Sequence, residues 1–233
     1  MKILLSTIAF LCFSPFHTFE KEVQESVNFL RKEKATVLEI KKASATPLRG
    51  SEANMEGEAL AIVFPELIRW SAFKDFFETK ALELMYISGG KSAADFSIGY
   101  FQMKPSFIEN LEDYIAEHPS VQHLNFIISA DKNAEQCRAE RVQRLQQLSW
   151  QLRYAHIYWA IANDLFKNKK FENAQVRIRF FAAAYNYGFL RPQLEIEQWQ
   201  SKIAFPYGVK YKGAQVVYTD LAVEFFEKYA NEF

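Results

Sequence analysis

Cysteine and histidine are scarce in this sequence. Only Cys12 and Cys137 are present, and removal of an N-terminal signal would take Cys12 with it, so an exported form would have no internal disulfide. None of the four histidines has a cysteine or a pair of carboxylates at the spacing of metal ligands. We therefore expect a fold stabilised by packing, with no metal and no other cofactor.

Neither sign of charge is in excess. Lysine plus arginine and aspartate plus glutamate each number 28, so no global field would attract nucleic acid or an anionic membrane. What the sequence does contain is 49% hydrophobic and 16% aromatic residues, which predicts a compact core. A neutral or locally recognised ligand fits this balance better than a polyanion.

The first residues have the layout of a secretory signal. Lys2 precedes an apolar run that ends at Phe13 and is too short for a permanent membrane anchor. We expect residues 1–18 to be a signal peptide and the mature protein to be exported, either to the periplasm or by secretion. Residues 19–56 are charged and helix-prone, and we expect a surface helix and linker there, followed by the main domain at 57–233.

Most of the main domain has the apolar period of helices. Only Asp95–Met103 is typical of an extended segment, and we expect it to form a small β-hairpin that ends at Pro105. The predicted fold class is therefore mainly α-helical with a small β-hairpin.

Three later helices are expected from the same period. Residues 134–166 keep it over one long helix, and residues 175–187 form another helix that stops at Gly188. Residues 219–229 form the last helix, with Thr219 as its N-cap.

One helix carries a carboxylate on its apolar stripe. Between Ala59 and Trp70, apolar residues recur at intervals of three and four, and Glu66 falls on the same stripe. A buried carboxylate without a partner shifts its pKa upward and holds a proton near neutral pH, as a general acid must. The alternative is that Glu66 reaches solvent or caps the turn that restarts after Pro65.

Two motifs follow Glu66 in order, GYFQMKP at 99–105 and AAAYNYG at 182–188. Together with the glutamate they resemble the lysozyme-like lytic transglycosylases of the soluble-transglycosylase family, which cleave peptidoglycan. That family pairs a catalytic glutamate with Gly-x-x-Gln-x-x-Pro and later with Ala-Ala-Tyr-Asn-x-Gly. The resemblance covers roughly 57–229 and implies a lysozyme-like α+β domain whose hairpin flanks the cleft. Residues 73–92 would then be an insertion over or beside this cleft.

The resemblance implies that Glu66 is the sole acid and base. As an acid it protonates the leaving glycosidic oxygen between MurNAc and GlcNAc, while the sugar carbon gains oxocarbenium character. As a carboxylate it then takes the proton of the muramyl 6-hydroxyl, which closes a 1,6-anhydro ring without water. The substrate's N-acetyl group assists in place of a second carboxylate. The expected partner is the glycan strand of peptidoglycan, with no nucleic acid and no metal, and we expect a monomer.

Residues of the two motifs are candidates for glycan contacts: Tyr100, Gln102, Met103, Tyr185, Asn186 and Tyr187. The Gln102 amide could hold an N-acetyl or hydroxyl group, and Asn186 could orient a tyrosine or the glutamate. Tyr185 and Tyr187 could stack on sugar faces. The alternatives are structural: Gln102 would satisfy its own turn, and one of the two tyrosines would be a core aromatic.

Asp95 keeps a rival mechanism open. As a second carboxylate it could activate water, which would make the enzyme a hydrolytic muramidase of the same fold. As a turn or capping residue it would have only a structural role. A rival from another class is a non-catalytic module that binds peptidoglycan through a retained cleft.

Overall fold

Helices account for most of the structure, a computed structural model that describes residues 15–37, 55–72, 77–127 and 132–233. In chain order they are α1 (Pro15–Lys32), α3 (Met55–Ala72), α4 (Phe77–Gly89), α5 (Pro105–Glu117), the 3₁₀ helix η1 (Pro119–Ile127), α6 (Ala134–Leu145), α7 (Leu148–Leu165), α8 (Ala174–Tyr187), α9 (Gln193–Trp199), α10 (Tyr218–Tyr229) and the 3₁₀ helix η2 (Ala230–Glu232). Over these ranges the sheet content is one small antiparallel pair, β1 (Ile203–Phe205) and β2 (Val216–Val217). The prediction of a mainly helical fold is confirmed.

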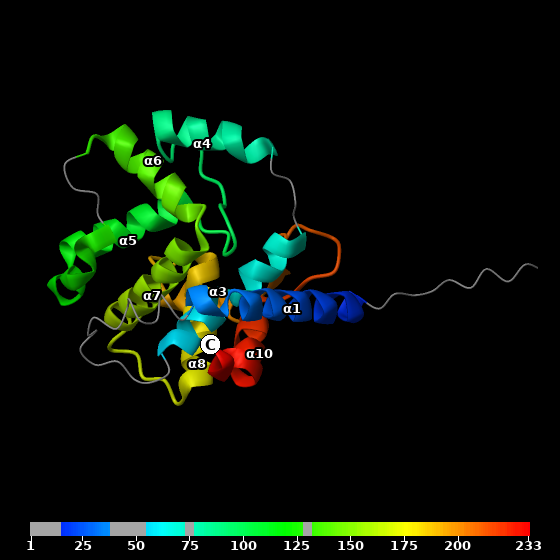
Figure 1. The fold of residues 1–233 in the computed structure, drawn as a ribbon. Helices are drawn as coiled ribbons and strands as arrows, with labels where there is room; N and C mark the ends of the chain where they lie inside the picture. The colour runs from blue at the N-terminus through cyan, green and yellow to red at the C-terminus, as the bar shows by residue number, and fades with distance from the viewer. Residues whose placement is uncertain (1–14, 38–54, 73–76, 128–131) are drawn as a thin grey trace, which may run out of the picture.

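Helix α3 lies at the centre of the fold. It packs against α1, α7, α8 and α10, and Figure 1 shows these helices gathered around it. Every residue from Glu58 to Ile68 is buried, as expected for a helix that is apolar on nearly all sides. Pro65 lies inside α3 and does not end it. Glu66 therefore lies on a helix whose middle part is buried on all sides.

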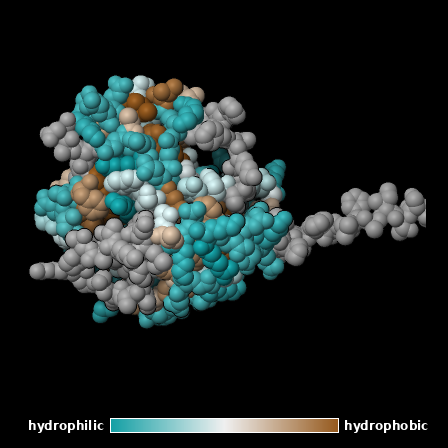
Figure 2. Space-filling view, viewed as in Figure 1, coloured by the Kyte–Doolittle hydropathy of each residue, from teal (hydrophilic) through white to brown (hydrophobic). Residues whose placement is uncertain are grey.

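Helix α1 is amphipathic and belongs to the fold. Val27 and Leu30 are fully buried on its inner side, and Arg31 forms an ion pair with Glu232 at 2.8 Å. Its outward face is hydrophilic (Figure 2). The expected surface helix thus has a second face that adds to the core. Residues 38–54 of the expected linker and 1–14 of the expected signal lie outside the described residues, while α1 begins within the range expected for the signal. Across the described chain, none of the helices combines the length and apolar character that a bilayer crossing requires.

The hairpin predicted at Asp95–Met103 is present only as one antiparallel bridge, without strands on either side of it. Ile98 and Met103 form a single isolated bridge around a tight turn, and the two strands lie instead at β1 and β2. Within the turn, the N–H of Gln102 donates to Gly99 O at 3.1 Å. The buried side chain of Gln151 bonds Phe101 N and Ile98 O, and Phe101 O accepts from the Tyr185 hydroxyl. No continuous ladder is needed to satisfy this segment.

Two helix boundaries also differ from the prediction. The long helix expected over 134–166 is broken between α6 and α7, where the Gln151 side chain takes the Leu145 carbonyl that the end of α6 leaves free. Thr219 is not an N-cap: α10 begins at Tyr218, and the Thr219 hydroxyl donates to Gln200 O at 2.6 Å.

Candidate active site

The three motifs recognised in the sequence meet in space. The side-chain amide of Asn186, near the end of α8, donates to Glu66 Oε1 on α3 across 3.3 Å. The Tyr185 hydroxyl donates to the backbone oxygen of Phe101, in the second motif, across 2.9 Å. Glu66, the turn at 99–102 and the C-terminal end of α8 therefore form one cluster.

Burial weakens the acidity of Glu66. The residue is 5% exposed, and this desolvation raises the pKa of its carboxyl from 4.5 to about 7. The charge of Arg69, with Nη1 at 3.5 Å, and the amide of Asn186 oppose the shift without cancelling it. Glu66 is thus able both to give up and to hold a proton near neutral pH.

Glu66 differs in its polar contacts from the other buried glutamates of the described chain, which are Glu58, Glu83 and Glu112. Each of these three lies within 2.8 Å of a cationic group: Glu58 of Arg177 (2.5 Å), Glu83 of Lys80 (2.8 Å) and Glu112 of Arg141 (2.6 Å). The two contacts to Glu66, at 3.3 and 3.5 Å, are longer. A buried carboxylate with close partners is a structural ion pair, whereas one with long contacts is poised to change protonation state.

The turn that carries Gln102 is held in place by the buried side chain of Gln151. Gly99 and Gln102 have positive φ angles of 70° and 48°. Gln151, fully buried, accepts from Phe101 N at 2.6 Å and donates to Ile98 O at 3.2 Å. The Gln102 amide donates to Gly99 O at 2.8 Å, so its NH₂ group serves its own turn, as the structural alternative expected.

The structure places Tyr100 and Met103 in different surroundings. Tyr100 is half-buried against Trp70, which lies one helical turn after Glu66, with ring centroids 4.5 Å apart. Phe29 of α1 stacks on Tyr100 at 5.2 Å, so α1 covers one face of this ring. Met103 is only 1% exposed and packs in the core, where its side chain is shielded from a ligand.

The tyrosines of the third motif are both half-buried. Tyr185 packs edge-on against Phe107, with ring centroids 5.2 Å apart. Tyr187 stacks on Trp199 at 4.4 Å and donates its hydroxyl proton to Glu195 at 3.0 Å. One face of the Tyr187 ring is therefore covered by protein.

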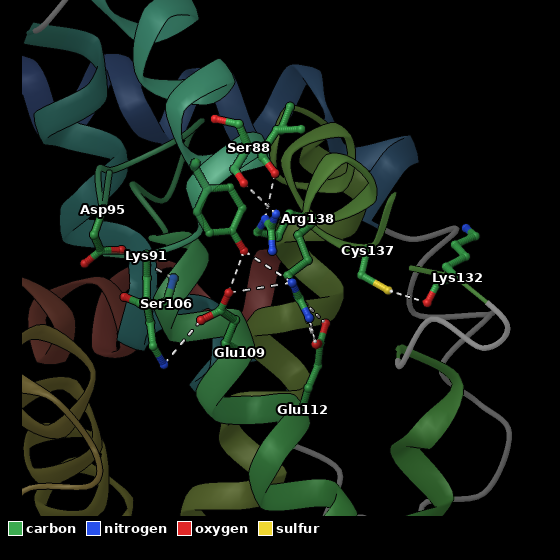
Figure 3. A network of polar contacts seen from close by, with 12 residues as sticks. Ser88, Lys91, Asp95, Ser106, Glu109, Glu112, Lys132, Cys137 and Arg138 are labelled. Atoms are coloured by element: carbon green, nitrogen blue, oxygen red, sulfur yellow. Dashed lines mark hydrogen bonds and ion pairs between the residues drawn. The ribbon is translucent and has the colours of Figure 1, made fainter. Parts of the chain in front are cut away.

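Asp95 precedes α5 by ten residues in the chain, and its side chain contacts the first turn of this helix. Its carboxylate accepts from the Ser106 backbone N–H at 3.4 Å (Figure 3). The same carboxylate is 3.4 Å from Lys104 Nζ. Asp95 thus accepts an N–H in the first turn of a helix, as the structural alternative of a capping residue predicts.

The segment expected to be an insertion contains α4, which packs against α6. Arg138 of α6 donates to the backbone oxygens of Ile87 and Ser88 at the end of α4, at 2.7 and 2.9 Å (Figure 3). Nearby, Tyr86 donates to Glu109 of α5 at 2.8 Å. These contacts fix α4 to the helices beside it. Residues 73–76 of the segment lie outside the described residues.

Three residues of the cluster were not identified from the sequence as part of it. Arg69 lies three positions after Glu66, a spacing that predicts contact on a helix and could have revealed it. Tyr218 donates to Ile62 O at 3.0 Å, and burial together with the Glu66 charge raises the pKa values of Tyr218 and Tyr185. Trp199 donates from its indole nitrogen to Asn186 Oδ1 at 2.9 Å, a contact that no local pattern indicates.

Within the part of the chain that the structure describes, no group of three or more histidine, cysteine, aspartate or glutamate side chains is arranged to hold a metal ion. Comparisons with protein-family models, curated proteins and solved structures give no match for this chain.

Proposed function

We propose that this protein is a peptidoglycan lytic transglycosylase, a lyase that cleaves the bond between MurNAc and GlcNAc and leaves a 1,6-anhydro-MurNAc end. The observation that carries the proposal is the state of Glu66, which is buried, has only long polar contacts and lies against the asparagine of the third motif. The domain would be lysozyme-like, with the turn at 98–103 beside the cleft.

The first step needs a proton at the leaving oxygen. A glutamate with a pKa of about 7 is protonated in a large fraction of molecules at neutral pH and donates readily. As the proton leaves, the carboxylate gains charge, which the Asn186 NH₂ group and Arg69 stabilise from 3.3 and 3.5 Å. The N-acetyl group of the substrate would stabilise the sugar cation.

The second step returns the proton to the same residue. The ionised Glu66 accepts the proton of the muramyl 6-hydroxyl as that oxygen attacks the anomeric carbon. One bond to the anomeric carbon breaks and one forms, and water is not consumed. A single carboxyl group with a pKa near the working pH suffices for both steps.

The neighbouring residues would shape and support this centre. Tyr185 bonds the end of α8 to the turn at 99–102, and Asn186 bonds the same end of α8 to Glu66. These two bonds would keep the distance between Glu66 and Gln102 constant. The Gln102 carbonyl oxygen and the half-buried rings of Tyr100, Tyr185 and Tyr187 are the groups proposed to contact the glycan. Export to the cell envelope would bring the protein to this substrate.

The proposal is tested by digestion of purified peptidoglycan sacculi and mass spectrometry of the released fragments. The wild-type protein should release fragments with 1,6-anhydro ends, which weigh one water less than reducing ends. Glu66→Gln should lose this activity and still sediment with sacculi. Asp95→Asn is the matched control and should keep the activity, because Asp95 contacts Lys104 and α5.

Two other results would replace the proposal. Reducing ends in the wild-type digest, lost in Asp95→Asn, would indicate a hydrolytic muramidase. Binding to sacculi without fragment release by the wild-type protein would indicate a non-catalytic module.

A further inference from the structure

Three side chains from three helices form a chain of hydrogen bonds that ends at Glu66. The indole N–H of Trp199 in α9 donates to Asn186 Oδ1 at 2.9 Å. The Asn186 amide in α8 in turn donates through Nδ2 to Glu66 Oε1 in α3 at 3.3 Å. In this series of hydrogen bonds Trp199 bonds Asn186 and not Glu66. Any effect of Trp199 on Glu66 is therefore transmitted through the Asn186 amide.

The chemistry of the indole group fixes which end of the amide faces the glutamate. A side-chain amide has an acceptor oxygen at one end and a donor NH₂ group at the other, and the two ends have almost the same shape. The indole nitrogen is only a donor. If the Asn186 amide were reversed, its NH₂ group would oppose the indole N–H, and both donors would lose their acceptor.

Trp199 is itself held in place by packing. Its ring stacks on Tyr187 at a centroid distance of 4.4 Å and an interplanar angle of 22°. The Tyr187 hydroxyl donates to Glu195 Oε2 at 3.0 Å, which ties the stacked pair to α9. Ile196 of the same helix is fully buried and anchors it against the core.

We propose that Trp199 is a positioning residue that keeps the NH₂ end of the Asn186 amide, and not its oxygen, directed at Glu66. The inference rests on the proposed function for its catalytic meaning, although the orientation itself does not depend on it. An NH₂ group stabilises a carboxylate, whereas a carbonyl oxygen stabilises a protonated carboxyl group. Trp199 therefore favours the charged form that Glu66 must reach after it donates its proton.

Other groups near Glu66 remain when Trp199 is changed. They are Arg69 on its own helix, Tyr185 on α8 and Tyr218 on α10. Arg69 supplies the charge that favours ionisation, and the two tyrosines stay neutral in the working range because burial raises their pKa values. A change in Glu66 that follows substitution of Trp199 is thus attributable to the amide.

The test compares Trp199→Phe with Trp159→Phe. The first variant removes the indole N–H and keeps a ring that can stack on Tyr187. The second removes an indole N–H that donates at 3.0 Å to Glu58, another buried glutamate on α3. Glu66 is followed by ¹³C NMR of its carboxyl group over a pH titration, with the signal assigned by its loss in Glu66→Gln.

In Trp199→Phe the apparent pKa of Glu66 should move upward, and in Trp159→Phe it should stay at the wild-type value. Loss of one hydrogen bond to the charged form should also lower kcat on sacculi about tenfold. KM should change little, because Trp199 is not among the groups proposed to contact the glycan and phenylalanine keeps a ring that can stack on Tyr187. A folded Trp199→Phe protein with an unchanged Glu66 titration would overturn the proposal.

The wild-type protein offers a second measurement that needs no variant. The NH₂ proton signals of Asn186 should shift as Glu66 titrates, and the Trp199 indole proton should exchange slowly with solvent. Asn186 NH₂ signals that do not respond to this titration would contradict the proposal. A wild-type protein without activity on sacculi would reject the proposed function, while these NMR results would still decide the role of Trp199.

Discussion

The Asn186 side-chain amide donates a hydrogen bond to the Glu66 carboxyl group although the two residues are 120 positions apart in the chain. This contact joins the central helix α3 to the end of α8. Because the carboxyl group is buried and its contacts are long, small changes around it should alter its protonation.

Glu66→Gln should be more stable than the wild-type protein at alkaline pH. The pKa of Glu66 is about 7 in the folded protein and ordinarily 4.5, so the folded state binds this proton more tightly than the unfolded state. This tighter proton binding stabilises the folded state fully below about pH 4.5, and the stabilisation is lost as the pH rises through 7. The free energy of unfolding should fall by about 3 kcal/mol over this range. Glutamine stays neutral, so urea unfolding at pH 8 should give the variant the larger free energy of unfolding, and the difference should shrink toward pH 5.

Glu58→Gln is the matched control for this experiment. Glu58 is as buried as Glu66 and lies on the same helix, yet it is paired with Arg177 at 2.5 Å. Its replacement removes the carboxylate from this buried ion pair and should destabilise the protein by about 3 kcal/mol or more, at pH 8 as well as at neutral pH. Equal behaviour of the two variants would contradict the contrast drawn between these glutamates.

Activity should fall as the pH rises above about 7, because the first step needs protonated Glu66. Arg69→Met should move this alkaline limb of kcat/KM to higher pH, since the guanidinium group opposes the rise in the Glu66 pKa. Arg153→Met, which removes a cation that stacks on Trp150 at 5.1 Å, serves as the control and should leave the limb in place. If the alkaline limb stays in place in Arg69→Met, a group other than Glu66 determines this pH dependence.

Gly99→Ala should disrupt the turn that presents Gln102. Gly99 has a φ of 70°, and an added Cβ would overlap the Gln151 side chain and lie 2.6 Å from Leu145 O. We expect a loss of at least about 2 kcal/mol in the free energy of unfolding, together with loss of activity. Gly208→Ala, at a φ of 84° with no atom within 4 Å, should cost only about 1 kcal/mol and keep the activity.

Leu30→Ala should show that α1 is part of the cooperative fold. Leu30 is fully buried, and truncation of a buried leucine costs about 2–5 kcal/mol. Lys21→Ala on the same helix, with a side chain 78% exposed, should change the free energy of unfolding by less than about 0.5 kcal/mol. Equal thermal unfolding of the two variants would mean that α1 is not packed as the structure has it.

The sequence contained enough information to find α3 and the acidic residue on it. The apolar stripe of this helix predicts a face directed at the core, and the carboxylate of Glu66 on that stripe is conspicuous. The periodicity also predicted α8 and its end at Gly188, where φ is 125°. These features depend on neighbours within one or two turns of helix.

Other features depended on contacts that no local pattern encodes. Glu58 lies in the same apolar helix as Glu66, and only the position of Arg177, 119 residues later, makes it a paired structural residue. Gln151 bonds the Leu145 carbonyl at the break between α6 and α7 and also the turn at 99–102, which lies about 50 positions earlier in the chain. The segment predicted as a hairpin therefore forms a single bridge, and the place of Trp199 in the site was not predicted.

The most direct measurement of the central claim is the titration of the Glu66 carboxyl group in the free wild-type protein, followed by ¹³C NMR. The account predicts a midpoint near pH 7, with the group still largely protonated at pH 6. A midpoint near 4, the value of a glutamate in water, would contradict it, because Glu66 would then be ionised when the first step requires its proton.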